Sequence, residues 1–392
     1  INKDSVILDP WNGSGTTTYV AAKNGYKAIG YDINPVMYFV AKARDVSPSS
    51  MKMLKKTYLD ILHNIKPCEE KLNLEIDPLS DWLTKKTVNV IRAIEYSIQN
   101  TLLNKSEYTP LYIDRNKMLS LTTTSAFFYL ALFRVLKEIS HVFRSSNPTW
   151  IKKPKTSFEK RNYSRDYLIN SFKKQVEELL DFLEQEEVNE HDNQTLLGIE
   201  SSSLLPLENE CIDIVITSPP YCTRIDYAIL TSLELSLLGF SKDDIKNLRR
   251  NLIGSPVMWE EVPKINKKWG SYCLEIIDLI KNHPSKASET YYLRTYLQYF
   301  NSIYTSLKEI NRVLKNNGKC VFVVQNSYYK DIYINLAKIF IDMAKSLNWK
   351  IIEEFVYSAK QNMININTKS NLYRFKGTKE NEYVLIFEKE GI

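Results

Sequence analysis

Short apolar runs and helical periodicity alternate at the start of the chain. The first apolar run ends at Asp9, a turn rich in glycine and threonine follows, and Gly25 closes the first helical stretch. The pattern predicts a strand at residues 6–8, a helix at 19–24, a strand at 28–32 and a helix at 34–44. This order is typical of a parallel, doubly wound sheet, so we expect an α/β protein.

The alternation then stops, and apolar residues recur at helical spacing from residue 46 to residue 195. A segment of this length is too long for a connecting loop, so we predict a helical insertion over residues 46–195. The predicted helices cover residues 51–65, 82–99, 122–143 and 164–187.

Strand-like runs return at residues 195–199 and 211–217. A smaller polar insertion follows at residues 240–290, and then a long amphipathic helix that ends at Asn316-Asn317-Gly318. The remaining predicted elements are a strand at 319–325, a helix at 332–347 and a strand pair at 350–357 and 382–388. These elements complete a seven-stranded, Rossmann-like sheet in a discontinuous domain of residues 1–45 and 196–392.

The composition narrows the class of protein. A chain of 392 residues with 44% hydrophobic residues is long enough for two domains, or for one domain with a large insertion. The formal net charge of +6 permits a polyanionic partner without requiring one. No apolar run approaches the length of a membrane span, so we expect no membrane partner.

Cysteine and histidine are sparse. Five cysteines without metal-ligand spacing and four histidines that lie well apart predict reduced thiols, no metal site and a cytoplasmic location. We expect no signal peptide, because the sequence begins without one. Because the first residue is isoleucine and a strand begins almost at once, we expect the natural protein to extend further upstream.

The turn after the first strand reads Asp9-Pro10-Trp11-Asn12-Gly13-Ser14-Gly15-Thr16-Thr17. Its glycines let a ligand approach the backbone closely, and the helix N-terminus that follows offers free N–H groups. Asp32 ends the second strand, where an acid can bind two ribose hydroxyls. Thr18 stands where a dinucleotide motif has its third glycine, which disfavours a nicotinamide dinucleotide. The turn suits a nucleoside with a small charged tail, and S-adenosyl-methionine has that shape.

A second motif, Thr217-Ser218-Pro219-Pro220-Tyr221, follows the apolar run at residues 211–217. Two consecutive prolines fix φ and hold the backbone carbonyls in one direction. The carbonyl of Pro219 and the hydroxyl oxygen of Ser218 can each accept a hydrogen bond from an exocyclic amine. This arrangement favours a pyramidal nitrogen, whose lone pair is free to attack a methyl sulfonium. Tyr221 then offers a face on which a flipped base can stack.

These two motifs resemble the cofactor and catalytic motifs of amino-group DNA methyltransferases. Two further stretches are similar to the core of that family, Asn311-Arg312-Val313-Leu314 and Asn381-Glu382-Tyr383-Val384-Leu385. The resemblance covers residues 4–45, 195–239 and 293–390 and leaves both insertions uncovered. It implies S-adenosyl-methionine as cofactor, duplex DNA with a flipped target base as substrate, and a methyltransferase domain of residues 1–45 and 196–392.

The resemblance also assigns site residues. The expected catalytic residues are Ser218, Pro219, Pro220 and Tyr221, and serine at position 218 is typical of the cytosine-N4 branch, so we expect methylation of cytosine N4. The expected cofactor-binding residues are Asp9, Pro10, Trp11, Gly13, Ser14, Gly15, Thr16, Asp32 and Glu200. Glu200 is the candidate for the acid that contacts adenine after the third strand. Trp11 replaces the usual phenylalanine, and the motif that normally precedes the first strand is absent.

Other functions stay open. The adenine-N6 branch usually has Asp or Asn in place of Ser218, and RNA amino-group methyltransferases share the Pro-Pro corner. A non-catalytic nucleic-acid-binding module could keep the same fold. Cytosine-C5 methylation is disfavoured because its thiolate usually follows a proline, whereas Pro220 precedes a tyrosine, so we expect Cys222 to pack. A restriction or defence partner protein is left open.

Basic residues interleaved with aromatic ones mark candidate contacts to nucleic acid, because they can neutralise phosphates and stack on bases. They gather in the stretch from Arg144 to Lys174, with a second group near residue 250 and one residue just after the corner. The expected nucleic-acid-binding residues are Lys152, Lys153, Lys155, Lys160, Arg161, Arg224, Arg249 and Arg250. By its size and position, the helical insertion is the candidate for target recognition.

Overall fold

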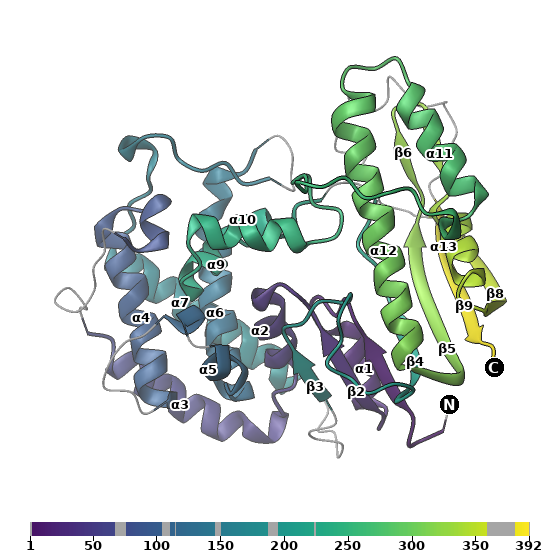
Figure 1. The fold of residues 1–392 in the computed structure, drawn as a ribbon. Coiled ribbons are helices and arrows are strands. Elements are labelled where there is room, and N and C mark those ends of the chain that lie inside the picture. The colour runs from purple at the N-terminus through teal and green to yellow at the C-terminus, as the bar shows by residue number, and fades with distance from the viewer. Residues whose placement is uncertain are drawn as a thin grey trace.

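The computed structural model describes residues 2–66, 76–103, 110–113, 115–145, 150–186, 195–222, 225–358 and 381–391. Seven strands form one sheet in the order β3-β2-β1-β4-β5-β9-β8 (Figure 1). The strands are β1 (Val6–Asp9), β2 (Lys27–Tyr31), β3 (Thr195–Gly198), β4 (Ile212–Thr217), β5 (Leu314–Gln325), β8 (Trp349–Ser358) and β9 (Asn381–Lys389).

The first five strands in this order run parallel, and β9 runs antiparallel to both β5 and β8. The predicted α/β, Rossmann-like class is therefore confirmed. The strand order reverses between β1 and β4, which lie side by side with Leu8 opposite Val215. Ligands of doubly wound sheets bind at such a switch point, beyond the carboxyl ends of the strands.

Two groups of helices flank this sheet (Figure 1). One group combines α2 (Pro35–Arg44) with α3 (Met51–His63), α4 (Lys85–Leu103), α5 (Arg115–Leu119), α6 (Thr123–Ile139) and α7 (Arg165–Glu184). The other group combines α11 (Ser271–Asn282), α12 (Leu293–Val313) and α13 (Leu336–Lys345). The remaining helices are α1 (Thr16–Lys23), α8 (Tyr227–Leu230), α9 (Ser232–Leu238) and α10 (Lys242–Asn251).

The helical segment packs on α2, a helix that flanks the sheet. Phe39 of α2 stacks at an angle on Tyr129 and Phe133 of α6, with ring centroids 5.2 and 5.6 Å apart. The side chain of Arg92 is 1% exposed and donates to the carbonyls of Ser236 and Leu237 at the end of α9. These contacts fix α6 and α9 beside the carboxyl ends of the strands.

Two element predictions were wrong in detail. The helix expected at residues 332–347 is α13, which begins only at Leu336, after a hairpin of β6 (Ser327–Tyr329) and β7 (Ile332–Ile334). Alternating tyrosine and isoleucine side chains suit strand pairing, and Asn335 caps the helix by accepting from the N–H of Lys338. The preceding helix ends at Val313, and residues 315–318 bulge out of β5 between Leu314 and Lys319. Among the described residues, no helix has the length and apolarity to cross a membrane.

Candidate active site

The turn after β1 and the corner after β4 meet at the switch point of the sheet. The hydroxyl of Thr217, at the end of β4, donates to Oδ1 of Asp9, at the end of β1, over 2.6 Å. The N–H of Trp11 donates to the same oxygen over 3.1 Å. Asp9 is only 3% exposed, and through these two hydrogen bonds it links the two motifs inside the protein. A cavity of about 1220 Å³ opens above them and is lined by residues of both.

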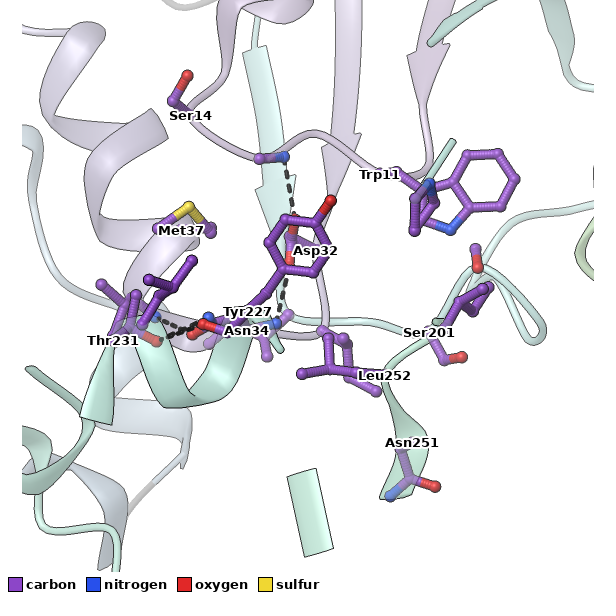
Figure 2. A pocket seen from close by; sticks show the side chains of 18 of the residues that line it. Trp11, Ser14, Asp32, Asn34, Met37, Ser201, Tyr227, Thr231, Asn251 and Leu252 are labelled. Atoms are coloured by element: carbon purple, nitrogen blue, oxygen red, sulfur yellow. Dashed lines mark hydrogen bonds between the residues drawn. The ribbon is translucent and has the colours of Figure 1, made fainter. Parts of the chain in front are cut away.

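Asp32 organises the turn after β1. Its two carboxylate oxygens accept from the N–H of Gly13 over 3.0 Å and from the N–H of Asn34 over 2.8 Å (Figure 2). Gly13 and Gly15 have φ values of +50° and +79°, in the left-handed region that favours glycine. A Cβ on Gly15 would lie 2.7 Å from Cβ of Ala41, so α1 and α2 pack closely only because that residue is glycine.

Burial raises the pKa of Asp9 and of Asp32, each to about 6. Hydrogen bonds from Thr217 and Trp11 oppose the rise at Asp9, and those from the N–H groups of Asn34 and Gly13 oppose it at Asp32. Both acids are therefore charged at neutral pH. Asp32, which lines the cavity, presents a carboxylate that can accept further hydrogen bonds there.

In the corner after β4, one hydroxyl and one carbonyl have defined hydrogen-bond partners. The Ser218 hydroxyl donates to the carbonyl of Val323 over 3.1 Å and also contacts the Tyr221 hydroxyl, and its oxygen can in addition accept a hydrogen bond. The hydroxyl of Tyr299 donates to the carbonyl of Pro220 over 2.9 Å and holds the corner against α12. Burial raises the pKa of Tyr221, the nearby charge of Glu382 adds to the rise and a hydrogen bond with Ser218 opposes it, so this phenol is neutral at physiological pH.

Comparison with known proteins agrees with this geometry. The profile of a family described as DNA methylase matches residues 1–43 and 212–392. The chain belongs to the DNA methylase family. Type II methyltransferase M.BsoBI of Geobacillus stearothermophilus is 24% identical, over 95% of this chain and 78% of that protein. Type II methyltransferase M.AvaI of Nostoc sp. is 23% identical, over 88% of this chain and 73% of that protein. Type II methyltransferase M.MvaI of Kocuria varians is 22% identical, over 87% of this chain and 74% of that protein.

Membership confirms the predicted resemblance and the cofactor, S-adenosyl-methionine, which supplies an electrophilic methyl group when bound. The residues present in this DNA methylase fit that cofactor. Gly13 leaves its surroundings open, since a Cβ there would find no atom closer than the carbonyl oxygen of Trp11 at 3.9 Å. Trp11 Nε1 is buried and has no hydrogen-bond partner among the described residues, so a donor is available beside the cavity.

The predicted cofactor residues divide into two groups. Those that line the cavity are Pro10, Trp11, Gly13, Ser14, Asp32 and Glu200. Figure 2 shows Ser14 on the side of the pocket away from Leu252, with Asp32 in the centre of the view and Trp11 on the right. Asp9, Gly15 and Thr16 do not line it: Asp9 joins β1 to β4, Gly15 packs against Ala41, and Thr16 begins α1 on the surface. All four corner residues, Ser218 to Tyr221, line the cavity.

None of the described nucleic-acid candidates lines the cavity. Lys153 pairs with Asp81, and Arg249 pairs with the buried Asp226 over 2.7 Å while its guanidinium lies 5.7 Å from the ring centre of Trp150. Arg250 lies 4.0 Å from Glu260. Lys152, Lys155 and Arg161 are exposed and Lys160 is half-buried, on the loop that leaves the cavity at Ile151. Arg224 lies outside the described residues.

Several cavity residues have no motif in the sequence. Lys137 and Arg144 are exposed at its edge and come from the helical insertion. Glu234, Leu252 and Trp259 come from the segment that follows the corner. Tyr227, six residues after Tyr221, also lines the cavity. Burial raises the pKa of Tyr227 to about 12, so its hydroxyl is a neutral hydrogen-bonding group between the corner and Asp32.

Proposed function

We propose that this DNA methylase transfers the methyl group of S-adenosyl-methionine to the exocyclic amine of a DNA base, with cytosine N4 preferred to adenine N6. The observation that carries the proposal is the hydrogen bond from the Ser218 hydroxyl to the Val323 carbonyl, 3.1 Å long. Because the single hydroxyl proton is engaged there, the oxygen faces a substrate only as an acceptor.

Two acceptors at the corner suit the two hydrogens of an exocyclic amine. The Ser218 oxygen accepts one and the carbonyl of Pro219 accepts the other, so the nitrogen is held pyramidal with its lone pair toward the methyl donor. Tyr299 engages the neighbouring carbonyl of Pro220, which leaves Pro219 as the proline that serves the amine. Serine rather than a carboxylate or amide at this position supports cytosine.

The first experiment offers duplex DNA and tRNA side by side to the purified protein with tritiated S-adenosyl-methionine. Transfer of label to DNA and not to tRNA is the expected result. Label in tRNA alone would reject DNA as the substrate, and label in neither, with the cofactor bound in calorimetry, would favour a module without catalytic activity.

We further propose that the strand carrying the target base reaches the cavity past Lys137 and Arg144. Both are exposed at its edge, and the basic loop that holds Lys152, Lys155 and Arg161 leaves the cavity from the same side, at Ile151. Phosphate contacts release counterions, so Lys137→Ala and Arg144→Ala should each weaken DNA binding and reduce the slope of log K against log salt by roughly 1. Lys52→Ala, an exposed lysine of α3 that is no part of the cavity, should leave the slope unchanged.

A further inference from the structure

The segment from Asn251 to Trp259 lies directly against the catalytic corner. Figure 1 shows the chain after α10 passing from the helices of the insertion to α12. Gly254 has a φ of +78°, and a Cβ there would lie 2.9 Å from the carbonyl oxygen of Tyr221. Asn251, Leu252 and Trp259 line the same cavity as the corner, and Figure 2 shows the first two on the side opposite Ser14.

Three hydrogen bonds fix Trp259, which lines the cavity. Its backbone N–H donates to Oε1 of Gln298 over 3.1 Å, and its carbonyl accepts from Arg294 over 2.8 Å. The indole Nε1–H donates to the carbonyl of Arg250 over 2.8 Å. The polar edge of the ring is thus turned back into the protein, and the indole requires no further ordering to receive a planar ligand.

Helix α12 shows at which end of the cavity this indole lies. The hydroxyl of Ser306 is hydrogen-bonded to that of Ser202, in the loop after β3. The same loop holds Glu200, the predicted adenine contact, so Ser306 marks the end of the cavity that receives the nucleoside of the cofactor. Gln298, which anchors Trp259, lies eight residues earlier, about 12 Å along the helix. Its neighbour Tyr299 anchors the carbonyl of Pro220 over 2.9 Å. Trp259 therefore lies at the level of the corner and away from the nucleoside end.

We propose that the indole of Trp259 forms, opposite Tyr221, the second aromatic wall of the slot that receives the flipped target base. The assignment rests on the proposed function and deepens it by naming a residue that holds the base rather than the cofactor. A base between two fixed rings is held in plane while its amine meets the acceptors of Ser218 and Pro219. Stacking on an aromatic ring commonly changes binding by about tenfold or more per base, which sets the size of the expected effect.

The experiment compares Trp259→Ala, Trp259→Leu and Trp259→Phe with the wild type. The position that the wild type methylates in plasmid DNA is mapped first, and a duplex with 2-aminopurine at that position reports flipping by its fluorescence. We expect Trp259→Ala and Trp259→Leu to lose at least tenfold in kcat/KM for DNA and most of the fluorescence rise, while Trp259→Phe keeps both within about threefold. Cofactor affinity in calorimetry should stay within twofold of the wild type for all three variants.

Met258→Ala is the matched control, because Met258 precedes Trp259 in the same segment, is 40% exposed and does not line the cavity. It should behave as the wild type. Trp259→Leu keeps a large apolar side chain but has no aromatic ring, so it tests the stacking role even if Trp259→Ala does not fold. Wild-type values of kcat/KM and fluorescence in the leucine variant would overturn the assignment, and so would a loss confined to cofactor affinity. If the wild type itself methylates no DNA amine, the proposed function has failed instead.

Discussion

Glu234 is a buried acid whose ionisation destabilises the folded protein, and its replacement gives a quantitative test of the structure. It lies in α9 at 5% exposure, and its Oε2 has no hydrogen-bond partner among the described residues. Burial raises its pKa from 4.5 to about 7, although its own backbone N–H and the charge of Lys137 oppose the rise. Glu234→Gln removes the ionisation and keeps the shape of the side chain.

The sign follows from proton binding. Between pH 4.5 and about 7 the folded protein retains a proton on Glu234 that the unfolded chain has released, so the wild type loses stability as the pH rises through this range. For these two pKa values the loss is less than about 1 kcal/mol at pH 5 and about 3 kcal/mol at pH 8. The glutamine variant has no such loss. Its stability relative to the wild type should therefore increase by about 2 to 3 kcal/mol between pH 5 and pH 8.

Urea unfolding of both proteins at pH 5 and pH 8 measures this difference directly, because contributions from Asp9, Asp32 and other acids cancel between them. The part of the stability difference that is common to both pH values reports only how the amide packs in place of the acid, so the test is the change in that difference between pH 5 and pH 8. A relative stability that does not change with pH, or that falls toward pH 8, would refute the burial of an unpaired carboxyl at this position.

Two further changes test the catalytic and cofactor residues. Ser218→Ala removes one of the two acceptors for the amine, so single-turnover transfer to DNA should slow by about 100-fold or more while cofactor affinity in calorimetry is unchanged; transfer at the wild-type rate would exclude a role for the hydroxyl. Asp32→Asn should weaken cofactor binding at pH 8 by about tenfold. Because the pKa of Asp32 is raised to about 6, wild-type affinity should fall as the pH drops through 6 and approach that of the variant, which should itself change little with pH.

The sequence was informative wherever the chemistry is local. The turn at Asp9 to Thr17 and the corner at Ser218 to Tyr221 each stand at the end of one strand, so a pattern of strand, turn and helix was enough to find them. Their meeting followed from strand order, because β1 and β4 are neighbours at the switch point. Glu200, named for its place after the third strand, also lines the cavity.

The far wall of the cavity depends on tertiary contacts that no local pattern carries. Trp259 faces the corner because Gln298 and Arg294, more than thirty residues later, hold its backbone. Arg249 looked like a phosphate contact in a basic run, yet the buried carboxylate of Asp226 engages it. Lys137 lies on a helix with no motif and reaches the cavity because α6 packs on α2. Contacts with residues far away in the sequence therefore determine where the side chains of Trp259, Arg249 and Lys137 lie.

The central claim is that Ser218 and Pro219 present acceptors to the exocyclic amine of a DNA base beside a bound methyl donor. Mass spectrometry of nucleosides from DNA methylated by the wild type and by Ser218→Ala tests it most directly. The account predicts N4-methyl-deoxycytidine with the wild type and little or none with the variant. N6-methyl-deoxyadenosine would keep the amine chemistry and reject the preference for cytosine, whereas 5-methyl-deoxycytidine, or equal yields from both proteins, would contradict the mechanism.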